Sequence, residues 1–424
     1  MTSITRRRFS GLIGGGAASL ALPIKLRARD KLRVVVVGGG AGGATAARYL
    51  AKDSDGALDV VLIDSAESYT SCFYSNLFLG GFHDREYIRH DYATLESEYG
   101  ITKITDRATG VDRKRKRVVL SGGDEILYDR LILSPGIDIR YDSVPGYSLA
   151  ASRRAPHAWQ GGEQTDWLKT GLDALGSGDN IVMVAPPNPY RCPPGPYERA
   201  SMMAHVLKSR GYTDSTITIL DTKPAFSKQG LFIEGWDKYY PGMIDWIPPE
   251  IHGGILNVDA EAGTVETDFD TFEGSLLNII PAQRAGDIAV VAGLTDDTGY
   301  CPVDADSMRS TKDTAIFVIG DASIAGAMPK SGFSANSQAR VAAMQVRADL
   351  TGSERMPALY ANTCWSLIAE DDGVKVGANY AAVDGKISVT SNFISQSGED
   401  AERRKSTYEE SIGWYQTITG DMFR

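Results

Sequence analysis

The sequence of 424 residues contains only four cysteines, at positions 72, 192, 301 and 364. None of them is followed by another cysteine three residues later, so the chain has no CxxCH segment. That segment is the attachment motif of c-type haem. Any covalently bound haem c that works with this chain must therefore be carried by another polypeptide.

Basic residues are fewer than acidic ones in the chain after residue 28. Residues 1–28 hold five basic residues and no acidic one, and removing them changes the formal net charge from −10 to about −15. This balance argues against nucleic acid as a partner and is compatible with a basic protein surface.

Residues 1–28 have the order of features found in an export signal. Three arginines, Arg6 to Arg8, precede Phe9 and the apolar stretch FSGLIGGGAASLALP, which is too short to span a bilayer. The opening TRRRFSG resembles a twin-arginine signal, which exports folded, cofactor-loaded proteins. We expect cleavage near Ala28 and a periplasmic mature protein. A basic tail with an apolar patch is the alternative.

A dinucleotide-binding motif follows at once. A buried strand at residues 32–37 leads into Gly38-x-Gly40-x-x-Gly43 and a helix rich in alanine. Gly38 permits the tight turn, Gly40 lets a pyrophosphate approach the backbone, and Gly43 lets the helix pack on the strand. The next strand ends in Asp64, whose carboxylate can accept hydrogen bonds from a ribose. A purely structural glycine turn is the alternative.

A second motif, in the last third of the chain, specifies the dinucleotide. The segment DTAIFVIGDASIAGAMPKSGF ends a strand in Gly320-Asp321 and resembles the second fingerprint of flavoproteins with two dinucleotide-binding domains. The resemblance implies that Asp321 binds the ribitol of FAD. A helix beginning near Phe333 would direct its positive end at the flavin pyrimidine, and Lys330 would add to that field. A solvated Lys330 is the alternative.

A second strand–helix–strand unit runs from IVMVA through a helix near Tyr197–Arg210 to TITILD. Related reductases hold a nicotinamide nucleotide here, yet the connecting loop PPNPYRCPPGPYE is rich in proline and poor in amide donors. We therefore expect no nicotinamide site. The loop instead presents Cys192, and Glu198 in the first helical turn is placed to exchange protons with a sulfur or simply to complement the helix dipole.

Together these segments resemble the flavoprotein subunit of flavocytochrome c sulfide dehydrogenase. The resemblance is carried by YTSCFYSNLFLGG, RCPPGPYERA, FSKQG, TGYCPVD, MPKSGFSANSQ and NTCWS. It implies that Cys72 is bonded to the FAD, that Cys192 and Cys364 form a redox-active disulfide, and that a c-type cytochrome subunit accepts the electrons of sulfide. The sequence itself leaves three pairings of four cysteines open. Cys301 is interpreted as a buried structural thiol.

The expected fold class is α/β, with two Rossmann-like dinucleotide-binding domains and a smaller α+β interface domain at the C-terminus. The FAD domain is predicted at residues 29–149 and 281–357, the second domain at 150–280 and the interface domain at 358–424. No metal site is expected. Two other functions stay open, a sulfide:quinone oxidoreductase with a membrane-facing apolar patch and a non-catalytic flavin redox partner.

Overall fold

The predicted N-terminal strand, glycine turn and helix are present in the computed structural model, which describes residues 31–424. The predicted export signal, residues 1–28, lies outside the described residues. Strand β1 (Leu32–Val37) leads into α1 (Ala41–Asp53) and then β2 (Leu58–Asp64). The central valines of β1 are completely buried, as expected for a strand covered on both faces of a parallel sheet.

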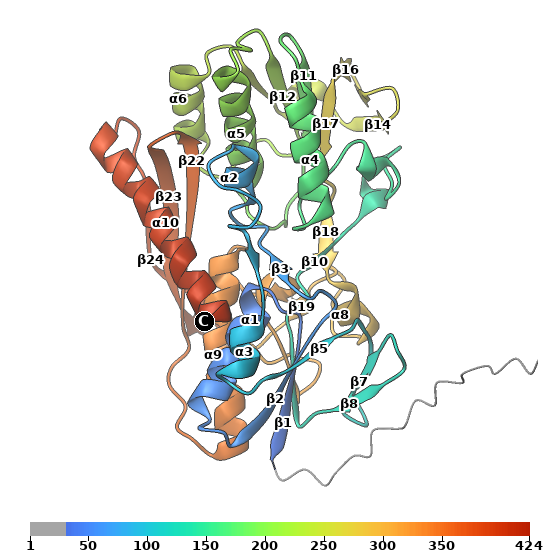
Figure 1. The fold of residues 1–424 in the computed structure, drawn as a ribbon, viewed down its shortest axis with the longest axis vertical. Helices are drawn as coiled ribbons and strands as arrows, with labels where there is room; N and C mark the ends of the chain where they lie inside the picture. The colour runs from blue at the N-terminus through green and yellow to red at the C-terminus, as the bar shows by residue number, and fades with distance from the viewer. Residues whose placement is uncertain (1–30) are drawn as a thin grey trace, which may run out of the picture. The chain divides into compact units, whose positions relative to one another are not determined.

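The first sheet joins segments from both ends of the described chain. Its order is β20-β9-β1-β2-β5, and every neighbouring pair is parallel. Its edge strands are β20 (Ile316–Val318) and β5 (Thr102–Thr105), and β9 (Arg130–Leu133) lies between β20 and β1. Helix α9 (Gly332–Thr351) packs beside α1 (Figure 1). The two sequence fingerprints therefore meet at one edge of one sheet, where the carboxyl ends of its strands lie.

The second parallel sheet has the order β13-β12-β11-β17. Its strands are β11 (Asn180–Ala185), β12 (Thr216–Asp221), β13 (Ile244–Ile247) and β17 (Leu276–Ile279). Helix α5 (Gly195–Ser209) begins two residues earlier than the sequence predicted, and α6 (Gln229–Tyr239) follows β12. The face of α5 that periodicity assigned to the core is completely buried: Ala200, Met203, Ala204 and Leu207. Mixed α/β architecture with two parallel sheets is thus confirmed.

The C-terminal part is an antiparallel sheet covered by a long helix. Strands β23 (Asp372–Val383) and β24 (Lys386–Ile394) form a hairpin whose two turn residues, Asp384 and Gly385, both have positive φ, a conformation that these residue types favour. The sequence did not predict the third strand, β22 (Leu359–Ala369), which pairs with β23 and carries Cys364. Helix α10 (Ala401–Phe423) packs on β23 and on α1 (Figure 1).

The remaining elements are shorter. They are β3 (Tyr69–Thr70), α2 (Ser75–Leu79), β4 (Arg89–His90), α3 (Ala93–Ser97), β6 (Ala108–Asp112), β7 (Arg117–Leu120), β8 (Glu125–Leu127), β10 (Ile137–Ile139), α4 (Glu163–Ala174), α7 (Pro249–His252), β14 (Ile255–Asp259), β15 (Thr264–Thr267), β16 (Thr271–Glu273), β18 (Gln283–Ala285), α8 (Asp287–Val291), β19 (Cys301–Pro302) and β21 (Ser323–Ile324). The predicted domain boundaries stay predictions. Among residues 31–424, no helix combines the length and apolar character that crossing a membrane requires.

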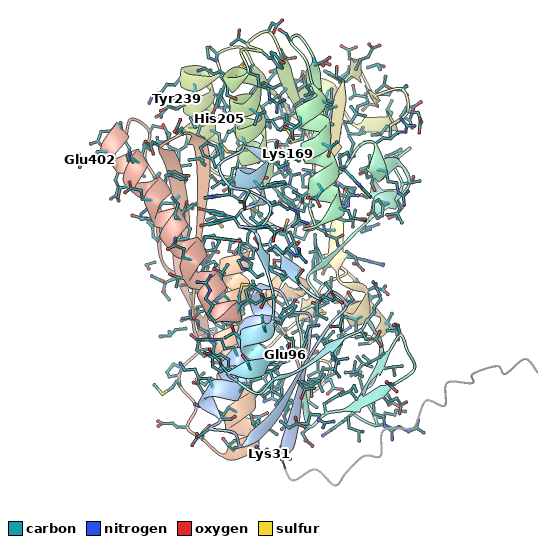
Figure 2. The ribbon with its side chains drawn as sticks, in the orientation of Figure 1. Lys31, Glu96, Lys169, His205, Tyr239 and Glu402 are labelled. Atoms are coloured by element: carbon teal, nitrogen blue, oxygen red, sulfur yellow. The ribbon has the colours of Figure 1, made fainter. Side chains whose placement is uncertain are left out.

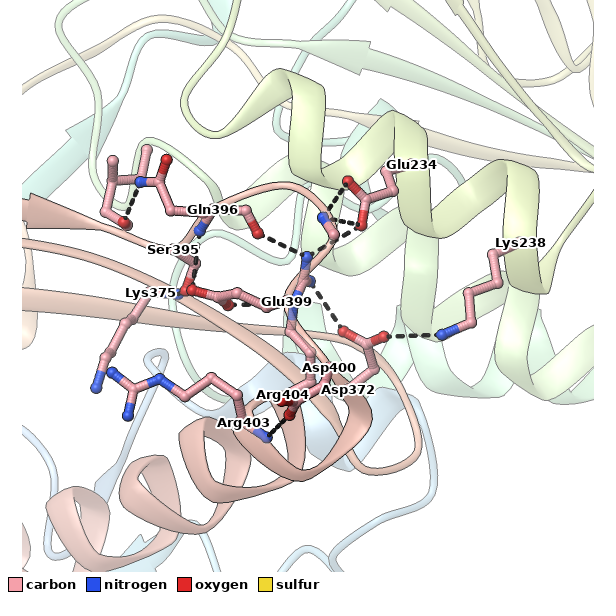
Figure 3. Close-up of polar contacts among 12 residues, drawn as sticks. Glu234, Lys238, Asp372, Lys375, Ser395, Gln396, Glu399, Asp400, Arg403 and Arg404 are labelled. Carbon is pink, nitrogen blue, oxygen red and sulfur yellow. Dashed lines mark hydrogen bonds and ion pairs between the residues drawn. The ribbon is translucent and has the colours of Figure 1, made fainter.

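A buried arginine fastens α10 to α6 and β23. Arg404 is 4% exposed, and its guanidinium lies 3.1 Å from Asp372 Oδ1 and 3.2 Å from Glu234 Oε1 (Figure 3). The Tyr239 hydroxyl donates to the other oxygen of Asp372 at 2.7 Å. In Figure 2, Tyr239 and Glu402 mark the two helices that this network joins. The network holds the C-terminal sheet against the second parallel sheet.

Replacing this arginine should destabilise the fold. We expect Arg404→Met to lower the free energy of unfolding by about 3 kcal/mol, because removing one partner leaves the buried Asp372 carboxylate without its counter-ion. The matched control is Arg403→Met at the exposed neighbouring position, expected to change stability by less than about 0.5 kcal/mol. Denaturant titrations followed by tryptophan fluorescence compare the two variants, and equal midpoints would show that the network contributes nothing.

Candidate active site

A cavity of about 590 Å³ opens beside the glycine-rich turn. Its walls come from the turn after β1, the segment after β20, the loop between β11 and α5, and strand β22. Its volume falls in the range of cofactor and ligand sites. The sequence-predicted residues that line it are Gly38, Gly40, Asp64, Cys72, Cys192, Glu198, Asp321 and Cys364.

The glycines leave the backbone open to a ligand. Gly38 has φ +98°, and a Cβ there would clash with the carbonyl oxygen of Ser134. A Cβ on Gly43 would clash with the carbonyl oxygen of Gly38, so α1 packs on β1 only because this residue is glycine. No side chain caps the N-terminus of α1 at Gly40. Its free N–H groups therefore suit a pyrophosphate.

The two acidic residues predicted to bind FAD, Asp64 and Asp321, line the cavity at the ends of two different strands, β2 and β20. Asp64 accepts hydrogen bonds from the backbone N–H groups of Gly39 at 2.6 Å and Ala66 at 2.9 Å, which fixes its carboxylate at the cavity wall. Asp321 accepts from Arg191 Nε at 2.6 Å through one oxygen, while its other oxygen is buried without a partner among the described residues. A buried acceptor without a donor fits a ligand hydroxyl at this point.

Arg191 is a site residue that the sequence analysis missed. Besides its ion pair with Asp321, its guanidinium donates to the carbonyl oxygen of Trp159 at 3.1 Å. Burial lowers the pKa of Arg191, but the charge and hydrogen bond of Asp321, together with Cys72 and Tyr69, raise it above its usual value. A permanent positive charge therefore faces the cavity. The only signal in the sequence was its position directly before Cys192.

Lys330 lies outside the cavity lining. Its ammonium donates to the backbone carbonyls of Asp321 and Ser323, both at 2.8 Å, and lies 3.8 Å from the centroid of the Tyr300 ring. Burial lowers the pKa of Lys330 to about 8. The alternative of a solvated lysine is wrong. These two hydrogen bonds hold the backbone of the segment Asp321–Ser323 in place.

Three of the four cysteines line the cavity from three separate parts of the chain. Cys72 precedes α2, Cys192 lies between β11 and α5, and Cys364 lies on β22. Cys192 has φ +58°, a left-handed backbone conformation that costs energy outside glycine. All four cysteines carry free thiols in the structure, so the predicted disulfide stays a prediction. Cys301 is completely buried away from this cavity.

The surroundings of Cys192 and Cys364 disfavour thiolates. Burial raises the pKa of Cys192 well above its usual value, and the nearby sulfur of Cys364 adds to the effect. Burial also raises the pKa of Cys364, partly opposed by a hydrogen bond from the Asn362 amide to its sulfur at 3.4 Å. Both groups are therefore neutral when reduced. Forming a thiolate at either one requires a proton acceptor nearby.

Glu198 lines the same cavity as these two cysteines. Its carboxylate is buried, receives hydrogen bonds from Asn76 Nδ2 at 2.8 Å and the Leu367 N–H at 2.9 Å, and lines the cavity. Burial raises the pKa of Glu198 above that of an exposed glutamate. These contacts tie α5 to α2 and β22. A charge that merely complements a helix dipole would have no need of them.

Lys228 is a second residue that the sequence analysis did not single out. Its ammonium donates to the Cys364 carbonyl at 3.1 Å and to Ser366 Oγ at 2.8 Å, and burial lowers its pKa to about 8. Its charge favours a thiolate at both Cys364 and Cys192. Its signal was the segment FSKQG, which was used as a family marker without a role for the lysine.

Comparisons with known proteins decide the family. Residues 165–281 match "Sulfide dehydrogenase (flavocytochrome c) flavoprotein chain, central", and residues 356–423 match "Flavocytochrome c sulphide dehydrogenase, flavin-binding". The chain belongs to the flavocytochrome c sulfide dehydrogenase flavoprotein family. Residues 32–168 also match the pyridine nucleotide-disulphide oxidoreductase family.

Curated relatives include mitochondrial sulfide:quinone oxidoreductases. The protein of Dictyostelium discoideum is 21% identical over 313 residues, covering 70% of this chain and 67% of the relative. The protein of Mus musculus is 23% identical over 322 residues, covering 69% and 66%. This chain therefore spans about two thirds of the length of these relatives.

Solved structures show the same fold at low identity. The sulfide:quinone oxidoreductase of Aquifex aeolicus superposes with a TM-score of 0.68 at 18% identity, covering 92% of each chain. The NAD-dependent persulfide reductase of A. fulgidus gives 0.64 at 16% identity, covering 89% of this chain and 77% of that one. The α/β flavoprotein fold predicted from the sequence is confirmed.

FAD is the cofactor of this family, and the residues of the cavity fit it. The free N-terminus of α1 suits the pyrophosphate, Asp64 suits the adenosine ribose, and the unpartnered oxygen of Asp321 suits a ribitol hydroxyl. When bound, FAD supplies two-electron acceptance and one-electron release. Arg191 then places its charge beside the group that Asp321 holds.

The carboxylate at the end of β12 is engaged by the chain's own side chains. At the end of β12, the fully buried Asp221 accepts from Tyr197 Oη and Lys223 Nζ at 2.6 Å each, and from Trp246 Nε1 at 2.9 Å. The carboxylate that would bind a nucleotide ribose is therefore already occupied. This geometry agrees with the proline-rich loop predicted to exclude such a nucleotide.

Proposed function

We propose that this chain oxidises sulfide through a Cys192–Cys364 disulfide beside FAD and delivers the electrons to a c-type cytochrome subunit. The observation that carries the proposal is that Cys192 and Cys364, from distant parts of the chain, line the cavity that holds the FAD-binding residues. The occupied Asp221 supports a sulfur donor of electrons in place of a nicotinamide.

The chain's own groups account for the sulfur chemistry. The sulfur of sulfide bonds to one cysteine, the disulfide bond breaks, and the second cysteine leaves with the electron pair as a thiolate. Glu198 takes the proton released by sulfide, and Lys228 stabilises the thiolate. Overall, one hydrogen sulfide yields one zero-valent sulfur, two protons and two electrons, and FAD is the acceptor of those electrons.

The electrons leave to a separate haem protein in this proposal. The sequence has no CxxCH segment, so the haem resides on a partner subunit, and the predicted interface is the C-terminal part, residues 358–424. Export by the twin-arginine signal places the complex in the periplasm. The acidic net charge suits a basic cytochrome surface.

The test is a visible spectrum of the purified flavoprotein. Anaerobic sulfide should bleach the flavin absorbance, NADH should leave it unchanged, and cytochrome c should be reduced on addition. Bleaching by NADH alone would reject the proposal. Reduction of a quinone but not of cytochrome c would favour the second candidate, a sulfide:quinone oxidoreductase. The similarity to the sulfide:quinone oxidoreductases of Dictyostelium and mouse is the reason for considering this candidate.

Covalent attachment of the flavin is proposed at Cys72, which lines the cavity with its sulfur 3.4 Å from the carbonyl oxygen of Trp159. In Cys72→Ser we expect the yellow colour to pass into the supernatant after acid precipitation, because no bond then links flavin and protein. In the wild type the colour should stay in the pellet. Colour in both supernatants would show a noncovalent flavin.

A further inference from the structure

A second cavity, of about 390 Å³, also reaches Cys364. The rest of its lining comes from the Pro193–Pro194 turn, Ser227, Pro329 and the strands β22, β23 and β24. None of these other residues lines the larger cavity. Cys364 is thus the single residue, among those lining the two described cavities, that both share. With FAD in the larger cavity, the smaller one offers separate access to this sulfur.

The walls of the second cavity are uncharged and mostly apolar, with the side chains of Ser227, Asn362 and Asn392 as polar members. They contain no lysine, arginine, histidine, aspartate or glutamate. Apolar side chains form the strand side of the wall: Val376, Ala378, Tyr380, Phe393 and Ile394. An ionised ligand entering such a space loses its hydration without gaining a counter-charge, whereas a neutral one does not.

One polar group in this cavity is directed at the cysteine. Asn362 is 3% exposed, and its Nδ2 donates to the sulfur of Cys364 at 3.4 Å. The hydroxyl of Ser331 donates to Asn362 Oδ1 at 2.5 Å, which fixes the amide in that orientation. The cavity therefore combines apolar walls with one oriented donor at the sulfur that reacts.

We propose that this second cavity is the binding site of the sulfur substrate, and that it selects small neutral sulfur compounds, dihydrogen sulfide above all, over charged thiols. The inference rests on the proposed function and adds the route and the selectivity. In the resulting step, the substrate sulfur bonds to Cys364, the bond to Cys192 breaks with its electron pair on Cys192, and the released proton passes to Glu198.

Reagents of different charge test the route without requiring turnover. The holoprotein is reduced with a phosphine and treated with methyl methanethiosulfonate or its anionic sulfonatoethyl analogue, and labelling of Cys364 is followed by peptide mass spectrometry. Each reagent transfers its alkylthio group to the cysteine thiolate, which forms a mixed disulfide, and methanesulfinate leaves. Relative to their rates with glutathione, we expect the neutral reagent to label Cys364 at least tenfold faster. Equal normalised rates would overturn the inference.

Two positions on β24 provide a matched pair of variants. Ile394 lines the cavity and is 47% exposed, while Val389 lines neither cavity and is 46% exposed. We expect Ile394→Trp to slow labelling of Cys364 by the neutral reagent at least fivefold and to raise the KM for sulfide, and Val389→Trp to change neither more than twofold. Identical behaviour of the two variants would refute the route.

A third variant fills the cavity from inside. Ala378→Phe should slow the same labelling reaction, whereas reduction of the flavin by dithionite should stay unchanged because the larger cavity is untouched. A loss of both would indicate general misfolding, and Ile394→Trp then decides. Labelling by a neutral reagent is independent of sulfide oxidation, so selective labelling without any turnover would reject the proposed function while retaining the cavity as a route to Cys364.

Discussion

Cys192→Ser is expected to keep its FAD, while the rate at which sulfide reduces that FAD falls about a thousandfold or more. A serine oxygen cannot form the sulfur–sulfur bond that sulfide must cleave. Because Cys192 and Cys364 act jointly in the proposed mechanism, loss of either sulfur should abolish turnover. The residues that suit FAD, among them Asp64 and Asp321, are unchanged in this variant, so FAD should still bind. Anaerobic stopped-flow spectroscopy of the flavin absorbance measures the rate.

Three further variants make this result specific. Cys364→Ser should be as inactive as Cys192→Ser, and the double variant no worse, because the two sulfurs act as one unit. Cys301→Ser is the matched control, since this thiol is completely buried and lines neither cavity. Its rate should stay within about threefold of the wild type. Rapid reduction by sulfide in Cys192→Ser would remove the disulfide from the mechanism.

The parts of the site that were predictable from the sequence depend on local constraints. The need for glycine at position 43 follows from a contact between residues five apart, where a Cβ would meet the carbonyl oxygen of Gly38. The buried stripe of α5 follows from helical periodicity alone. Such features need no knowledge of the rest of the fold. The same holds for the hairpin turn at Asp384–Gly385, where the residue types select the conformation.

The missed features depend on tertiary contacts. Strand β22 has no regular alternation of buried and exposed residues, because it pairs with β23 and also contacts α5, α6 and α9. The roles of Arg191 and Lys228 follow from partners more than a hundred residues away, Asp321 and the Cys364–Ser366 segment. Lys330 was predicted to lie near the flavin, but its ammonium is held by two backbone carbonyls and it does not line the cavity.

Glu198→Gln is expected to lower the rate of flavin reduction by sulfide about a hundredfold at neutral pH, in the range usual for loss of a positioned acid or base. The physical reason is that Cys192 and Cys364 are held neutral by burial, so the reaction needs a group that accepts a proton within the site. The amide of glutamine preserves size and can still accept the Leu367 N–H, but it cannot take up a proton.

The pH dependence of the rate identifies the carboxylate. Burial raises the pKa of Glu198, while the hydrogen bonds from Asn76 and Leu367 oppose the shift without cancelling it. The ionised form is the base, so the wild-type rate should fall as the pH drops through this raised pKa. Glu198→Gln should lack that decline. Flavin reduction is measured from pH 5 to pH 9, with sulfide expressed as its total concentration for both proteins.

A matched control separates proton transfer from helix electrostatics. Glu163 occupies the first turn of α4, as Glu198 occupies the first turn of α5, but it is exposed and lines neither cavity. Glu163→Gln likewise removes a negative charge from the first turn of a helix and should leave both the rate and its pH dependence unchanged. If Glu198→Gln also retains the wild-type pH profile, the carboxylate serves only to join α5, α2 and β22, and the proton acceptor lies elsewhere. If its profile is flat and slow while that of Glu163→Gln is normal, the buried carboxylate is the base that the neutral cysteines require.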